Sequence, residues 1–153
     1  MPSVILPVTH REQDTDGDCV AACVAMVLDY IGVSVPYERL IAILKTEWFG
    51  TVTSRILALE QLGVRIIYKQ GTLAELRAHL LNKQPPIAFV ATRELPYWNT
   101  DEKHAVVLVG IDDEYVYLND PAFPRAPIPV LIGDFDLAWL EWDELYAVLM
   151  KRE

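Results

Sequence analysis

The apolar run at residues 19–28, Cys-Val-Ala-Ala-Cys-Val-Ala-Met-Val-Leu, constrains the fold more than any other segment. It is apolar all round, so a helix here must be buried on every side. A polar, turn-like segment, Gln-Asp-Thr-Asp-Gly-Asp, precedes it at residues 13–18, and Gly32 follows where a C-terminal cap is expected. We therefore predict a central helix over residues 20–30, with Cys19 in its first turn.

The rest of the chain changes from helical to strand-like patterns. Helices are expected over residues 36–45, 53–62 and 72–81, the last opened by the capping box Thr-Leu-Ala-Glu. Strands are expected over residues 64–69, 86–91, 104–111, 115–120 and 146–150, with a short helix or turn over 134–142 and a proline-rich surface loop over 121–129. This order predicts one α+β domain over residues 1–153, with an antiparallel sheet packed on the Cys19 helix.

Composition narrows the classes of partner. A chain of 153 residues that is 52% hydrophobic has enough apolar side chains for a packed core. A net charge of −9 argues against nucleic acid and against an anionic membrane surface as partners. No apolar run reaches the length of a membrane span, and the N-terminal segment lacks the basic region of a signal peptide. We therefore expect a cytoplasmic location.

Three reactive side chains lie at the ends of predicted elements. Cys19 lies in the first helical turn, where free N–H groups and the helix dipole stabilise a thiolate. His104 opens one strand-like run and Asp120 ends the next. A thiol, an imidazole and a carboxylate are the parts of a nucleophilic active site. The acidic residues before Cys19 disfavour a thiolate, but Asp18 is expected to cap the helix. The effect of exposed carboxylates, which water and salt screen, is expected to be smaller than that of an imidazolium in contact with the thiol.

Hairpin geometry relates His104 to Asp120. A three-residue loop at 112–114 places Ile111 opposite Tyr115, so that paired residue numbers sum to about 226. Asp120 then lies on the same sheet face as His104 and diagonal to it, within contact distance. A loop of even length would place the two side chains on opposite faces.

Metal sites are not expected. The acidic run at 14–18 matches the first positions of a calcium loop, but Cys19 and Ala25 stand where that loop needs Gly and Glu. The spacing of the cysteines and histidines matches no zinc pattern. Cys23 falls within the apolar helix and is predicted to be a core residue, and His79 is predicted to be solvated.

Taken together, these motifs resemble the papain-like cysteine peptidases of the C39 type, the bacteriocin-processing (double-glycine leader) peptidase domains and their stand-alone relatives. The matching stretches are residues 13–26 with Gly32, then 50–51, 72–76, 104–110, 119–122 and 135–139. The resemblance implies a papain-like α+β fold with no metal or organic cofactor. It also implies roles for four residues: Gln13 in the oxyanion hole, Cys19 as nucleophile, His104 as base and Asp120 as its orienter. One departure is Val20, which stands directly after the nucleophile, where the family often has Gly.

The expected function is therefore a cysteine peptidase that cleaves peptide or protein substrates through an acyl-enzyme. Loop residues 92–103, with Tyr97 and Trp98, and residues 48–50 are expected to form cleft walls. Two alternatives remain at this point: acyl or peptidyl transfer through the same intermediate, and a non-catalytic peptide-binding module, which Val20 keeps open. The substrate sequence and the oligomeric state are not determined by these patterns.

Overall fold

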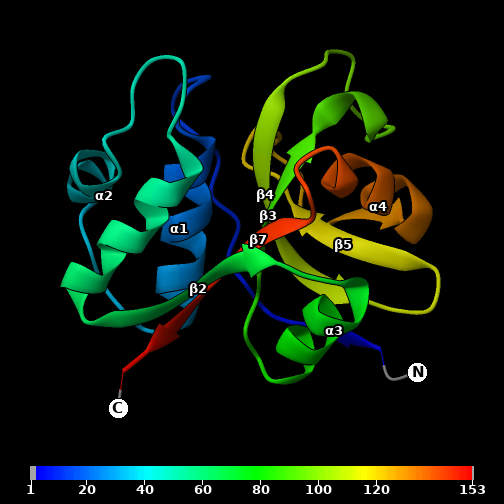
Figure 1. Cartoon of the computed structure of the whole chain (residues 1–153), viewed down its shortest axis with the longest axis horizontal. Coiled ribbons are helices and arrows are strands. Elements are labelled where there is room, and N and C mark those ends of the chain that lie inside the picture. The colour runs from blue at the N-terminus through cyan, green and yellow to red at the C-terminus, as the bar shows by residue number, and fades with distance from the viewer. Residues whose placement is uncertain (1–2, 153) are drawn as a thin grey trace.

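A computed structural model describes residues 3–152. The molecule has two halves, one made of helices and one built around the sheet (Figure 1). One half holds α1, α2 and the 3₁₀ helix η1, and the other holds most of the sheet with α3 and α4. The elements are β1 (Val4–Ile5), α1 (Cys19–Tyr30), α2 (Tyr37–Leu44), η1 (Thr53–Leu62), β2 (Val64–Gln70), α3 (Leu73–Leu81), β3 (Ile87–Ala91), η2 (Thr92–Glu94), β4 (Lys103–Ile111), β5 (Tyr115–Asn119), β6 (Ile128–Leu131), α4 (Ile132–Leu140) and β7 (Leu145–Lys151).

The predicted central helix is confirmed as α1, which begins at Cys19. Nine of its twelve residues are buried, as a helix that is apolar all round requires. At its C-terminal end the Val33 N–H donates to the Leu28 carbonyl over 2.9 Å. Gly32 supplies the left-handed turn at φ +80°, a conformation that favours glycine. The helix therefore begins after the polar turn and ends before the glycine that the sequence indicated.

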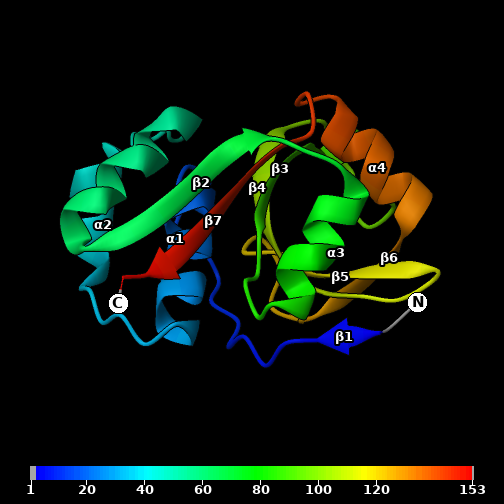
Figure 2. The same ribbon diagram turned by 60° about the horizontal axis from the view of Figure 1, so that its bottom comes forward.

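An antiparallel sheet packs on α1, which confirms the predicted architecture. Its strand order is β2-β7-β3-β4-β5-β6, and β1 pairs with β4. Among the strands, β4 makes the most extensive contact with α1. The long strands β2 and β7 pair along their whole length and cross from the sheet toward the helical half (Figure 2). The paired strands β2 and β7 thus connect the two halves, and α1 lies where the halves meet.

Two strands and one helix type differ from the sequence predictions. The expected surface loop at 121–129 ends inside β6, where Pro129 pairs with Tyr117. Because β6 is an edge strand, the missing N–H of proline removes no bond from the ladder. The two-residue β1 is too short to give a periodic signal. Residues 53–62 are helical as predicted, but as a 3₁₀ helix, and Gly63 ends it at φ +81°.

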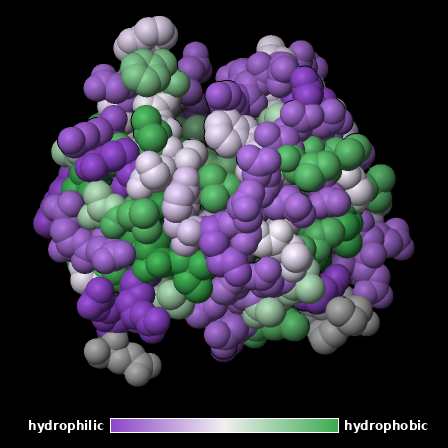
Figure 3. Space-filling view, viewed as in Figure 1, coloured by the Kyte–Doolittle hydropathy of each residue, from purple (hydrophilic) through white to green (hydrophobic). Residues whose placement is uncertain are grey.

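The surface is mainly polar, with a notch between the two halves (Figure 3). Apolar side chains stand out on the loop between α2 and η1, where Trp48 is 85% exposed and Phe49 and Val52 are also exposed. Within residues 3–152 no helix is both long enough and apolar enough to span a membrane.

Candidate active site

A tight turn before α1 fixes the position of Cys19. At Gly17 a Cβ atom would lie only 2.5 Å from the Trp48 carbonyl oxygen and 2.6 Å from that of Glu47. Only glycine therefore allows the turn to approach the loop that carries Trp48 so closely. This packing holds the N-terminus of α1 beside the α2–η1 loop.

The Asp18 side chain closes that turn and does not cap α1, which corrects the sequence prediction. Its buried carboxylate accepts hydrogen bonds from the backbone N–H groups of Asp14 (2.9 Å) and Thr15 (2.7 Å) and from the Tyr37 hydroxyl (2.6 Å). Burial raises the pKa of Asp18, but these hydrogen bonds outweigh burial and hold the pKa below its usual value. The donors stabilise the anion that lies nearest to Cys19 in the chain.

The imidazole of His104 and the carboxylate of Asp120 form a buried pair. His104 Nε2 lies 2.6 Å from Asp120 Oδ1, and the side chains are 4% and 0% exposed. The prediction that these two residues meet is confirmed. Because Nε2 faces Asp120, the other ring nitrogen, Nδ1, is the one available to a third group.

The two residues meet by a different register from the one predicted. At the turn Ile111 pairs with Val116 and Gly110 with Tyr117, so the loop has the even length that would separate His104 from Asp120. A β-bulge then adds one residue to β4 between Leu108 and Gly110, and below it Val107 pairs with Asn119. The bulge restores the sum of 226 and returns both side chains to one face.

Asp120 is held by donors on every side. Its Oδ2 accepts from the Tyr97 hydroxyl (2.7 Å) and the Trp98 indole N–H (2.9 Å). Its Oδ1 accepts from the Ala122 backbone N–H (2.9 Å) besides facing His104. Burial raises the pKa of Asp120, but the hydrogen bonds and the charge of His104 outweigh it and lower the pKa. Residues 97 and 98, expected only as a cleft wall, thus anchor the carboxylate.

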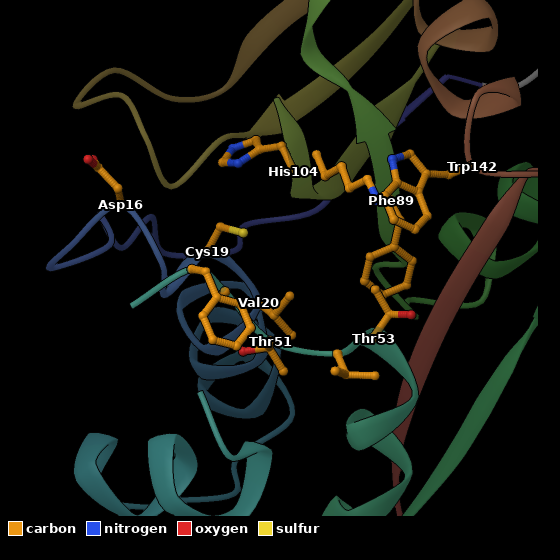
Figure 4. Close-up of a pocket in the computed structure, with 12 residues that line it drawn as sticks. Asp16, Cys19, Val20, Thr51, Thr53, Phe89, His104 and Trp142 are labelled. Carbon is orange, nitrogen blue, oxygen red and sulfur yellow. The ribbon is translucent and has the colours of Figure 1, made fainter. Parts of the chain in front are cut away.

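His104 is held in its charged form. Burial lowers its pKa, but hydrogen bonds to Asp120 and to Cys19, together with the charges of both, raise the pKa of His104 to about 10. Cys19 and His104 face each other across one end of a pocket (Figure 4). With Nε2 engaged by Asp120, it is Nδ1 that faces the Cys19 thiol.

Two cavities meet at this pair. The Cys19 cavity, about 350 Å³, lies between the two halves and is lined by Asp16, Cys19, Val20, Phe49, Gly50, Thr51, Val52, Thr53, Phe89, Lys103, His104 and Trp142. The second, called here the Gln13 cavity, is about 320 Å³ and is lined by Glu12, Gln13, Asp14, Thr15, Asp16, Trp98, Glu102, His104, Pro121, Ala122 and Phe123. Asp16 and His104 line both cavities, so the two cavities adjoin at these side chains.

Gln13 lies on the His104 side of the cleft. Its backbone N–H donates to the Pro121 carbonyl over 2.8 Å, which ties it to the turn after Asp120. Its side-chain oxygen is buried and has no hydrogen-bond partner among the described residues. The amide therefore borders the Gln13 cavity with one polar atom unused by the fold.

The remaining cysteine and histidine side chains have structural surroundings. Cys23 is fully buried, as predicted, and burial raises the pKa of its thiol. His79, predicted to be solvated, is instead half-buried, and its ring nitrogens contact Gln84 Oε1 and the Tyr146 hydroxyl, each over 2.9 Å. In the described part of the chain no three His, Cys, Asp or Glu side chains are grouped to hold a metal ion.

Comparison with known proteins identifies relatives over almost the whole chain. The family model of the peptidase C39 family matches residues 8–151. No curated protein sequence matches significantly. Among solved structures, a C39-like peptidase from Bacillus anthracis is 22% identical with a TM-score of 0.83, and the match covers 100% of both chains.

Two further structures share this fold. The first is a double-glycine motif protease from the AMS/PCAT transporter in complex with the leader peptide; it is 22% identical with a TM-score of 0.77, over 97% of this chain and 95% of the other. The second is the peptidase domain of Streptococcus ComA, a bifunctional ABC transporter of a quorum-sensing pathway; it is 20% identical with a TM-score of 0.75, over 95% and 99%.

Proposed function

This chain belongs to the peptidase C39 family of cysteine peptidases, and on that premise we propose that it cleaves peptide bonds with Cys19 as nucleophile, His104 as acid and base and Asp120 as orienter. The observation that carries the proposal is the His104–Asp120 contact of 2.6 Å beside the Cys19 thiol at the junction of two cavities. Family membership supports the reaction class, and the geometry supports the residues.

The first half of the reaction forms an acyl-enzyme. An imidazolium beside Cys19 favours the thiolate, which attacks the carbonyl carbon of the scissile peptide bond. The backbone N–H groups of the first turn of α1 have no partner within the helix, so that of Cys19 is free to donate to the oxyanion. The Gln13 side-chain amide is proposed as the second donor. His104 gives its proton to the leaving amine, the C–N bond breaks, and a thioester remains on Cys19.

The second half regenerates the thiol. His104, now neutral, removes a proton from a water molecule, which attacks the thioester carbonyl. The C–S bond breaks, the acid product leaves, and the proton returns to the Cys19–His104 pair. Throughout, Asp120 holds Nε2, so that Nδ1 faces the reacting atoms, and the Tyr97 and Trp98 donors keep the carboxylate ionised.

Val20 does not close the site. Its side chain is buried and lines the Cys19 cavity, yet that cavity keeps a volume of about 350 Å³. This volume supports the proposal that a substrate reaches Cys19 with valine at this position. A non-catalytic binding module would bind peptides at this cavity without cleaving them.

The test is incubation of the protein with a diverse synthetic peptide library, with products identified by mass spectrometry. We expect cleavage by the wild type and none by Cys19→Ala, a matched variant that removes only the sulfur. Cleavage that survives in Cys19→Ala would refute the proposal, as would binding without cleavage at every pH between 6 and 9. Added hydroxylamine traps the thioester as a hydroxamate, which reports the acyl-enzyme that hydrolysis and transfer share.

A further inference from the structure

The reaction assigns the two cavities to the two parts of the substrate, if the proposed function holds. The acyl group becomes bonded to Cys19, so the segment before the scissile bond lies in the Cys19 cavity. The leaving amine takes its proton from His104, and the Gln13 cavity is lined by His104 but not by Cys19. The segment after the scissile bond therefore lies in the Gln13 cavity.

The Cys19 cavity is mostly apolar but contains one lysine. Of the residues that line it, Lys103 is the one positive charge besides the His104 imidazolium, and Asp16 is the one Asp or Glu. The Lys103 ammonium lies 4.9 Å from the centre of the Trp142 ring. Asp16 and Trp142 lie at opposite ends of the pocket (Figure 4). The ammonium therefore lies at the end far from the carboxylate.

Lys103 has no carboxylate partner, although the chain is strongly acidic. Within residues 3–152 no Asp or Glu oxygen lies within ion-pair distance of its ammonium. Lys103 also lines a surface depression next to the cavity, called here the rim, together with Arg93. Arg93 forms ion pairs with Glu94, Asp101 and Glu141. Of the carboxylates on this rim, Asp101 and Glu141 are engaged by Arg93 and Glu102 accepts a hydrogen bond from the Thr100 hydroxyl. Asp143 also lines the rim but lies outside ion-pair distance of Lys103.

We infer that Lys103 is a specificity-determining residue that selects peptides with an aspartate or glutamate side chain in the acyl segment close to the scissile bond. Lys103 is exposed at the cavity end, so water screens its charge and its attraction for a substrate carboxylate is modest. A substrate carboxylate supplies the partner that the fold does not. A lysine at the same substrate position is repelled by Lys103.

One test uses matched peptides, identical except for Glu, Gln or Lys at one acyl-side position, scanned through the first four positions of a cleaved sequence. At one position the wild type is expected to cleave the Glu peptide about two- to fivefold faster than the Lys peptide, in kcat/KM. Lys103→Gln is expected to remove this preference and Lys103→Glu to reverse it. Lys69→Gln, which makes the same change of net charge away from the cleft, keeps it. The preference weakens as salt is added. Equal ratios in wild type and Lys103→Glu at every position would overturn the inference.

A second readout needs no peptide substrate. Iodoacetate and iodoacetamide alkylate the same thiol but differ in charge, so the ratio of their rates at Cys19 reports the local field. Lys103→Gln is expected to lower this ratio about two- to fivefold relative to wild type and to Lys69→Gln. An unchanged ratio would contradict the role of Lys103. If Cys19→Ala still cleaves peptides, the proposed function fails, while the alkylation ratio still decides whether Lys103 acts on Cys19.

Discussion

Replacing Asp120 with Asn tests the buried pair at its most sensitive point. Asn keeps the shape of the side chain but removes its charge and turns one acceptor oxygen into an NH₂ donor. With NH₂ on the Oδ2 side, it meets the Trp98 indole N–H, which cannot accept a hydrogen bond. With NH₂ on the Oδ1 side, it meets the Ala122 backbone N–H. Either orientation leaves one buried donor facing another.

The magnitude follows from burial. Breaking a buried ion pair by removing one charge costs about 3–5 kcal/mol, and an unsatisfied buried donor contributes about 1–3 kcal/mol of such a loss. Because Asp120 is 0% exposed and both orientations leave an unsatisfied donor, we expect Asp120→Asn to lower the free energy of unfolding by about 3–5 kcal/mol at pH 7. Urea unfolding followed by tryptophan fluorescence and circular dichroism measures this change.

The pH dependence of this loss has a definite sign. The folded-state pKa of His104 is raised to about 10, so its contribution is complete below the unfolded value near 6.5 and is lost as the pH rises through 10. The pKa of Asp120 is lowered, so its contribution is present above about 4 and is lost as the pH falls through the folded value. The difference between wild type and Asp120→Asn should therefore be largest between about pH 4 and 6.5, decline as the pH rises from there to about 10, and decline below pH 4. A difference below about 1 kcal/mol at pH 7, or one that does not vary with pH, would refute the reasoning.

Three other substitutions give independent checks. Tyr97→Phe removes one hydrogen bond to the Asp120 carboxylate and keeps the ring. We expect it to lower the free energy of unfolding by about 1–2 kcal/mol and to shift the upper limb of the pH–activity profile to lower pH. An unchanged profile would contradict the positioning role of Tyr97. Gly17→Ala should lower stability by more than 2 kcal/mol and slow Cys19 alkylation, because the new Cβ meets backbone carbonyls at 2.5 Å; normal stability would contradict the packing of that turn. Cys23→Ala should leave the alkylation rate of Cys19 within about twofold of wild type, and a large loss of labelling would assign Cys23 a chemical role.

Much of the site could be predicted from sequence because each part lies at the boundary of a strongly patterned element. The apolar run fixed α1 and therefore placed Cys19 at a helix N-terminus. The apolar strand placed His104 at its start, and the next strand ended before Asp120. Where periodicity was strong, the elements were found within one or two residues.

The failures share a different cause, which is contact between segments far apart in the chain. For Asp120 the predicted face is correct but the predicted loop is wrong, because β4 carries a bulge near Val109. The local sign of this bulge is Gly110, since an isolated glycine inside a strand often marks a bulge or a close backbone approach. Asp18 was expected to cap a helix, but the Tyr37 hydroxyl, nineteen residues later, and the nearby N–H groups of Asp14 and Thr15 donate to it instead. Tyr97 and Trp98 read as loop aromatics, and only the tertiary fold brings their donors to Asp120.

The most direct test of the central claim is the pH dependence of alkylation at Cys19. Native protein is treated with iodoacetamide between pH 5 and 10, and the labelled cysteine is identified by peptide mass mapping. The paired site predicts rapid labelling of Cys19 at pH 6.5, at least tenfold slower labelling in His104→Ala, and labelling of Cys23 only after unfolding. Labelling of Cys19 at pH 6.5 as slow as that of a free thiol, or the same rate in His104→Ala, would contradict the account.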